Sequence, residues 1–163
     1  MRQIAGIVFD SLALARDAGE ISGVLAVKDL PRLAEFALDH GGSLTCRLRG
    51  GRNEGGKLCL WLQVSGEVML TCQRCLQPML LPLQVDSTLL LMAPGAAWPD
   101  EELTDDSADA IEALAEQALA SLVEDEVLLA LPFAPRHESC ALPAGGGADD
   151  RPDSPFAALA RLK

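Results

Sequence analysis

The residues best suited to chemistry are Cys72 and Cys75, which are separated by two residues and followed by Pro78. Two thiolates at this spacing can ligate one Zn²⁺, because a tight turn directs both sulfurs at the same point. A structural zinc site needs four ligands, and His137 and Cys140 form a second pair of suitable type and spacing. The four residues therefore predict a tetrahedral Cys₃His site, with structural zinc as the candidate cofactor.

Two other interpretations of the thiol pair remain open. A redox CxxC motif normally follows a strand and opens a helix, which lowers the pKa of the first thiol. Behind Pro78 the residues alternate as in another strand, which disfavours a redox centre. The remaining interpretation is a turn whose thiols act only as small, half-buried apolar groups, as we expect for Cys46 and Cys59 on their strands.

A basic cluster between residues 47 and 57 is the second candidate site. Its segment GRNEGGK matches the phosphate-binding pattern G-x-x-x-x-G-K, but Leu58 stands where that loop needs Ser or Thr for Mg²⁺. The residues that follow alternate with period two, so no helix N-terminus is predicted to face a phosphate. We therefore predict a hairpin loop. The side chains that could contact RNA phosphates are Arg47, Arg49, Arg52 and Lys57. The alternative is a solvated hairpin edge protected by its charge.

The acidic run Glu124-Asp125-Glu126 is the remaining candidate for acid or base chemistry. Neighbouring carboxylates on a helix point in different directions, and we expect these to lie on its solvated face. The sequence contains two histidines and no G-x-S-x-G or H-E-x-x-H motif. We therefore predict a protein that is not an enzyme and has no small-molecule substrate.

The charge is unevenly distributed along the 163 residues, whose formal net charge is −11. Residues 1–90 carry nine Lys or Arg and nine Asp or Glu, whereas residues 91–163 carry four against fifteen. A strongly negative field repels phosphate and attracts basic partners, which favours a basic protein as a partner of the second part. The alternative is that the charge serves solubility alone.

The beginning of the chain and its cysteines bear on the compartment. The first residues, MRQIAGIVFD, lack the pattern of a secretory signal, and we identify no apolar run long enough to span a membrane. The cysteines number five, which favours reduced thiols or a metal site over a disulfide framework. We expect a cytoplasmic protein with no membrane partner.

Hydrophobic patterning predicts five short strands and three helices. Strands are expected at residues 20–27, 43–49, 57–64, 67–72 and 81–91. Hairpin connections are expected at Gly50–Gly56 and at Ser65-Gly66. Helices are expected at residues 10–18, with Asp10 or Ser11 as cap, at 32–38, ended by Gly41-Gly42, and from about 108 to 131, stopped by Pro132.

These elements predict an α+β fold, an antiparallel β-meander flanked by helices, with one long C-terminal helix. Five short strands would also allow a partly closed barrel. Residues 1–142 are expected to form a single α+β domain, and residues 143–163 a flexible Gly/Pro-rich tail. The apolar piece Phe156–Leu162 within this tail is expected to dock back as a short helix.

Four segments in matching order resemble the large ribosomal RNA subunit accumulation protein family (the YceD family). They are Cys72–Pro78, Val123–Pro132, Pro135–His137 and Pro155–Leu159, so the resemblance extends over residues 72–163. The family pattern marks Cys72, Arg74, Cys75, Pro78, Glu124, Glu126, Leu131 and Pro132. Many relatives continue with several more cysteines, including a second CxxC, whereas this chain has only His137 and Cys140 there.

The resemblance implies a non-enzymatic ribosome biogenesis factor that supports synthesis, processing or stability of 23S ribosomal RNA. The implied partner is large-subunit ribosomal RNA or a pre-ribosomal particle. Two alternatives are an acidic binding partner or holdase for a basic ribosomal protein, and a small zinc- or thiol-dependent regulator.

Overall fold

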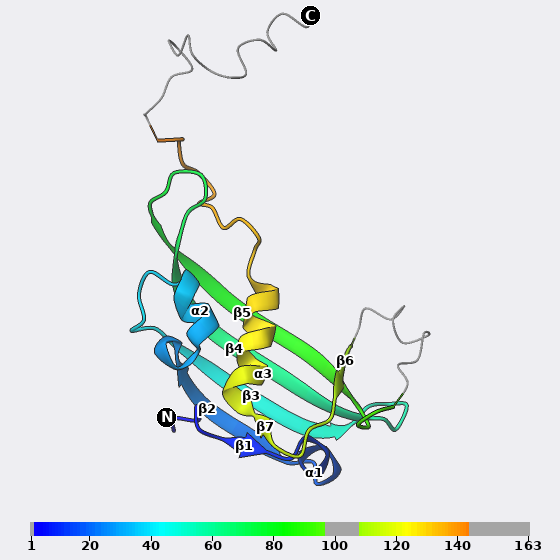
Figure 1. Ribbon diagram of the computed structural model, residues 1–163. Coiled ribbons are helices and arrows are strands. Elements are labelled where there is room, and N and C mark those ends of the chain that lie inside the picture. Colours follow the sequence, from blue (N-terminus) through cyan, green and yellow to red (C-terminus); the bar gives the residue numbers. More distant parts are fainter. Residues whose placement is uncertain (1, 97–107, 144–163) are drawn as a thin grey trace, which may run out of the picture.

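A computed structural model describes residues 2–96 and 108–143 and is built on one five-stranded sheet (Figure 1). Its strands, in spatial order, are β2 (Glu20–Ala26), β3 (Ser43–Arg52), β4 (Leu58–Thr71), β5 (Pro78–Met92) and β6 (Asp109–Glu112). The first four form an antiparallel meander, and β6 joins β5 in parallel. The predicted α+β meander is confirmed. The sheet stays open, because β2 and β6 are its two edges among the described residues, so the predicted option of a partly closed barrel is wrong.

The helices cover one face of the sheet. They are α1 (Ser11–Arg16), the single 3₁₀ turn η1 (Val27–Asp29), α2 (Pro31–Phe36) and α3 (Leu119–Ala130). Figure 1 shows α2 and α3 lying across the sheet. Alternate strand residues face these helices and form an aliphatic core; examples are Leu44, Leu48, Leu60, Leu62, Val64 and Leu89. Because this face is already covered by helices, the core is enclosed without closing the sheet into a barrel.

Gly50 allows α1 to approach the sheet closely. A Cβ atom at this position would lie 2.3 Å from the carbonyl oxygen of Leu14, which is backbone of α1 and cannot move aside cheaply. The helix begins at its predicted cap, since the carboxylate of Asp10 accepts a 2.8 Å hydrogen bond from Ala13 N–H. The prediction of a capped first helix is confirmed.

The prediction of a hairpin at Ser65-Gly66 is wrong, because β4 is one continuous strand through these residues. Gly66 keeps the period-two register between Val64 and Val68, so it does not interrupt the pairing with either neighbour. A Cβ atom at Gly66 would lie 2.7 Å from a side-chain atom of Leu44, so glycine permits close strand contact here rather than a turn.

The prediction of one helix from about 108 to 131 is wrong for nearly the first half of that range, because the helix begins only at Leu119. Residues 109–112 form β6, residues 117–118 form β7, and only residues 119–130 are helical. The segment between them is held by the buried Ser11, whose hydroxyl donates to Leu114 O at 3.0 Å and accepts from Leu114 N–H at 2.9 Å. Pairing of β7 with β1 (Val8–Phe9) completes this attachment, so long-range hydrogen bonds outweigh local helix propensity.

The other predicted helix, α2, is shorter than expected and ends at Phe36, before the glycine pair. No helix in residues 2–96 or 108–143 is long and apolar enough to cross a membrane. The predicted tail, with its apolar piece Phe156–Leu162, lies outside the described residues apart from Pro143.

Candidate metal centre

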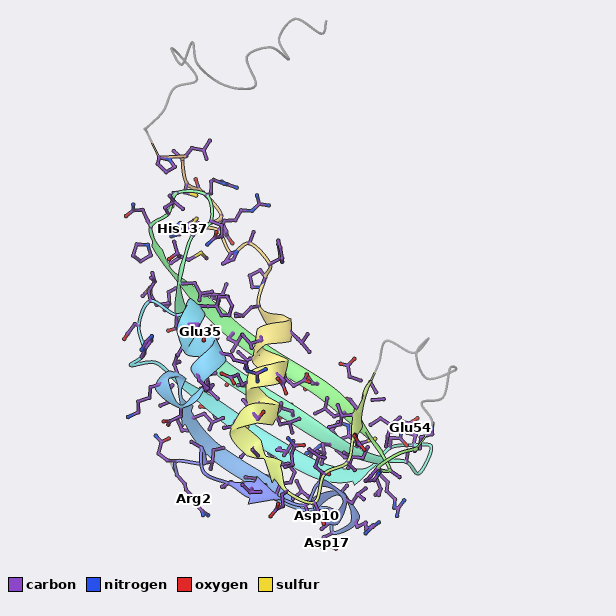
Figure 2. The ribbon with its side chains drawn as sticks, in the orientation of Figure 1. Arg2, Asp10, Asp17, Glu35, Glu54 and His137 are labelled. Carbon is purple, nitrogen blue, oxygen red and sulfur yellow. The ribbon has the colours of Figure 1, made fainter. Side chains whose placement is uncertain are left out.

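The four predicted metal ligands converge at one end of the sheet. Cys72 directly follows β4, Cys75 lies in the connection to β5, and His137 and Cys140 lie in the segment after α3. Their ligand atoms all lie within 4.8 Å of one another. Figure 2 shows His137 beside the tip of the β4–β5 hairpin. The structure thus brings together the two half-sites that the sequence separates.

The β4–β5 connection is a tight turn that positions the first two sulfurs. Cys72 N–H donates to Gln77 O at 2.9 Å, and Leu76 N–H donates to Cys72 O at 2.9 Å. Leu76 has a φ of 61°, in the left-handed region that a non-glycine residue adopts only at a cost. Pro78 opens β5 opposite Thr71, where the hairpin pairing begins again. This turn keeps Cys72 and Cys75 on the same side of the hairpin tip.

The separations within the cluster suit a tetrahedral zinc site. The sulfurs of Cys72 and Cys140 are 3.8 Å apart, and the sulfur of Cys75 is 3.3 Å from Nδ1 of His137. Two sulfurs each about 2.3 Å from a zinc ion and subtending a tetrahedral angle are about 3.8 Å apart. A sulfur and an imidazole nitrogen would be about 3.5 Å apart in the same geometry. Two pairs of donors therefore already have the separations of a tetrahedral Zn²⁺ site, and all four donors lie close enough to share one ion.

Backbone N–H groups around Cys72 favour its thiolate. Arg74 N–H and His137 N–H each donate to the Cys72 sulfur at 3.4 Å. Burial by itself would raise the pKa of Cys72, but hydrogen bonds from the backbone of Cys75, Arg74 and His137 lower it to about 5. A thiolate is the form that binds a metal ion. By contrast, burial raises the pKa of Cys46 to about 11, as expected for a thiol that packs in the core.

Further hydrogen bonds tie the segment after α3 to the turn. The Arg74 guanidinium donates to Cys140 O at 3.3 Å, and Gln73 N–H donates to Pro135 O at 2.7 Å. The helix itself ends at Ala130. The capping residue Leu131 still donates its N–H to Val127 O and is followed by Pro132. Arg74 therefore ties the second half-site to the first, and Leu131 and Pro132 lie where the chain leaves α3.

The expectation that residues 124–126 lie on a solvated face is wrong for Glu124 and Glu126, which are both buried. Glu124 reaches from α3 to the start of α2. Its Oε1 accepts from Arg32 N–H at 2.7 Å and from Leu33 N–H at 3.0 Å, while its Oε2 pairs with the Arg32 guanidinium at 2.9 Å. The carboxylate therefore caps α2 from a distant segment. The available signal in the sequence was the position of Glu124 directly after the apolar Val123 and three residues before the apolar Val127.

Glu126 is buried in a different environment. Burial raises its pKa, a hydrogen bond with the Ser87 side chain opposes this, and the negative charges of Asp109 and Asp125 add to the increase. The charges that act on Glu126 are thus those of other carboxylates, whereas Glu124 is paired with a guanidinium. Glu124 and Glu126 therefore belong to separate structural networks and do not form an acid–base pair.

The basic cluster is divided by the sheet. Arg47 and Arg49 lie on the face of β3 opposite to the helices, where Arg47 pairs with Glu20 at 2.9 Å and Arg49 lies over the Trp61 ring at 5.9 Å from its centroid. Arg52 has the opposite strand parity, and its guanidinium donates to Gly56 O at 2.8 Å. Lys57 lies in the hairpin loop, just before β4. We call the surface around Arg47, Arg49 and Trp61 the outer face.

The fold and the site together define a small α+β protein with a Cys₃His cluster at the tip of its longest β-hairpin. Residues 60–163 match the family described as large ribosomal RNA subunit accumulation protein YceD, and the chain belongs to this family. The resemblance seen in the sequence is thereby confirmed. The family description names ribosomal RNA accumulation and no chemical reaction. Neither the curated proteins nor the solved structures contain a match to the chain.

Proposed function

We propose that this protein is a non-enzymatic, cytoplasmic ribosome biogenesis factor that supports synthesis, processing or stability of 23S ribosomal RNA. The observation that carries the proposal is the family match, which extends over residues 60–163 and includes the Cys₃His cluster and α3. All eight positions of the family motif lie within it, from Cys72 to Pro132. Two of them make long-range hydrogen bonds: Glu124 joins α3 to α2, and Arg74 joins the hairpin tip to the segment after α3.

We propose that the cluster holds a structural Zn²⁺ through Cys72, Cys75, His137 and Cys140. Four protein donors fill a tetrahedral shell and leave no open position for a substrate, as in structural sites. The ion would join the hairpin tip to the segment after α3 and so fix one end of the molecule. A regulator that responds to zinc or to thiol oxidation would use the same four residues.

We propose that the outer face contacts ribosomal RNA. Arg47 and Arg49 present guanidinium groups on the sheet face that the helices leave uncovered, and Trp61 adds an aromatic ring beside them. Guanidinium groups bind phosphate, and an aromatic ring can stack on an unpaired base. Side chains of one strand parity form a continuous surface, so Arg47, Arg49 and Trp61 can contact one RNA segment.

A second candidate function is supported by the charge distribution. The whole net charge of −11 arises from residues 91–163, which suits a basic ribosomal protein as partner. Such an association would weaken with salt and persist after nuclease treatment. An association that nuclease abolishes would contradict it and leave RNA as the bridging partner.

The experiment that tests the main proposal is the ratio of large- to small-subunit ribosomal RNA in cells that lack the protein. We expect a selective loss of the large species, restored by the wild-type chain. Complementation by the double variant Arg47→Ala/Arg49→Ala should be reduced, while that by Arg52→Ala should be closer to normal. An unchanged ratio in the deletion strain would overturn the proposal.

A further inference from the structure

A groove of about 720 Å³ lies between the C-terminal ends of α2, α3 and β4. Its walls are mostly apolar; they include Phe36, Leu70, Leu128, Leu131 and Phe133. The segment 132–135 forms one side and is held in place by the hydrogen bond between Gln73 N–H and Pro135 O. The groove therefore lies beside the metal cluster but does not include its ligands.

Two aromatic side chains of the groove are exposed to an unusual degree. Phe133 is 106% exposed and Phe36 is 62% exposed in the described part of the chain. Single exposed apolar residues are common on protein surfaces, but two phenylalanines lining one groove with three leucines mark a site for another apolar group. The shape and composition indicate an occupant with a few large apolar side chains.

We propose that the occupant is the segment Phe156–Leu162 of the same chain. Its sequence FAALARL places Phe156, Leu159 and Leu162 at intervals of three residues, which one side of a helical turn would present together. The proposal goes beyond ribosomal RNA accumulation, because it assigns a function to the groove and to a segment outside the described residues.

Charge favours this segment over other parts of the tail. Glu35 is the charged residue of the groove lining, and Figure 2 shows it on α2. Residues 154–163 carry Arg161 and Lys163 and no acid, in a chain whose overall charge is −11. Residues 144–153 carry three Asp and one Arg and lack large apolar side chains. Of these two parts of the tail, the last one has both the apolar side chains that suit the walls and the positive charge that suits Glu35.

The chain is long enough to reach the groove. Pro135 lines it, and the described chain ends eight residues later at Pro143, so Pro143 lies within roughly 30 Å of it. Residues 144–155 add a connection of twelve residues, which extends to roughly 40 Å. Because the groove and the segment belong to one chain, the effective concentration of the segment at the groove is roughly in the millimolar range. A modest affinity is therefore enough for the segment to occupy the groove.

The test is amide hydrogen exchange of the full-length protein, followed by mass spectrometry of peptides that cover residues 156–162. We expect exchange at least about tenfold slower than for an unprotected peptide of the same sequence, independent of protein concentration. Phe36→Ser/Phe133→Ser should abolish the protection. Leu129→Ser is the matched control, since Leu129 is 77% exposed on α3 but does not line the groove. Zinc content is measured in each variant so that groove effects are separated from metal loss.

A charge exchange sharpens the test. Glu35→Arg should reduce the protection, and combination with Arg161→Glu should restore it, which a merely destabilised fold would not do. Exchange at the unprotected rate in the wild-type protein would overturn the proposal. Protection that appears only at high concentration would overturn it as well, because the segment would then bind to a second copy. If residues 156–162 are not protected, the proposed role in ribosomal RNA accumulation still stands, because that role is tested separately by the ratio of ribosomal RNAs in cells.

Discussion

The Cys₃His cluster and the basic cluster assemble in opposite ways. Cys72 and His137 are 65 residues apart in the sequence, yet their half-sites converge until all four ligand atoms lie within 4.8 Å. The basic residues are confined to positions 47–57, yet the sheet separates Arg47 and Arg49 from Arg52. Proximity in sequence is therefore a poor guide to proximity in space when a strand intervenes, because its side chains alternate between two faces.

Different contacts also hold the two sites together. The end with the Cys₃His cluster depends on contacts between distant segments, such as Arg74 with Cys140 and Gln73 with Pro135. The basic end depends on strand pairing and on local hydrogen bonds of the β3–β4 hairpin, such as Asn53 N–H to Lys57 O at 2.9 Å. Single substitutions should therefore affect the stability of the end with the Cys₃His cluster more than that of the basic end.

The largest effect is expected on loss of the metal. Gently purified wild-type protein should contain about one equivalent of zinc, and Cys72→Ser less than about a tenth, because a structural site needs its full ligand set. The melting temperature of the chelated protein should be about 10 °C lower than that of the protein in a large excess of free zinc. The measurement is metal analysis with differential scanning calorimetry. Cys59→Ala is the control and should retain zinc; a zinc-free wild-type protein would refute the site.

The next largest effect is expected at Glu124. Glu124→Ala should lower the free energy of unfolding by about 2–3 kcal/mol, because it leaves buried N–H groups of α2 without their acceptor. Asp125→Ala is the matched control on the same helix. The ion pair of Asp125 with Arg32, at 2.7 Å, joins two half-exposed side chains. It should therefore contribute much less to the free energy of unfolding. Urea denaturation measures both, and equal losses would contradict the assignment of Glu124 as a long-range cap.

A smaller effect distinguishes the two faces of β3. Replacing Arg47 or Arg49 with alanine should reduce the slope of log affinity against log salt for pre-ribosomal RNA by about 1 for each phosphate that the protein no longer neutralises. Arg52→Ala should leave the slope closer to that of the wild type, because Arg52 lies on the other side of the sheet. Filter binding over a salt series measures this. Equal effects of all three substitutions would show that the outer face is not the contact surface.

The smallest effect is expected at Glu126, whose pKa is raised mainly by burial. Because the folded-state pKa lies above the unfolded value of about 4.5, the folded protein binds this proton more tightly. Its contribution to stability is therefore greatest below pH 4.5 and declines as the pH rises through the folded pKa. Glu126→Gln should remove this decline, so the difference in unfolding free energy between the variant and the wild type should shift in favour of the variant as the pH rises. Parallel stability curves would contradict the shifted pKa.

The sequence predicts the sheet well because period-two alternation is a local signal. Leu44, Leu48, Leu60 and Leu62 fall on the buried face as expected. The start of α3 could not be predicted in the same way, since residues 109–118 are held by Ser11, β1 and β5, which lie far away in the sequence. Local propensity contains no information about such partners.

The Cys₃His cluster could be predicted, because cysteine and histidine at ligand spacing can be recognised from the residue types alone. The cap formed by Glu124 was not predicted, because a carboxylate on a helix is more often solvated and its acceptor role depends on α2. The groove was also not predicted. Its residues Phe36, Leu70 and Phe133 come from three segments whose arrangement only the tertiary structure determines.

The length of β4 has a consequence for how partners can bind. This strand runs unbroken from Leu58 to Thr71, a distance of about 40 Å at the usual rise per residue. Figure 2 shows Glu54 and His137 at opposite ends of the sheet. The β3–β4 hairpin loop and the Cys₃His cluster are thus separated by the length of β4. This distance is greater than the size of most small ligands and of many single protein modules. Two partners can therefore occupy the two ends at the same time without competing, and a single partner that touches both must itself be extended.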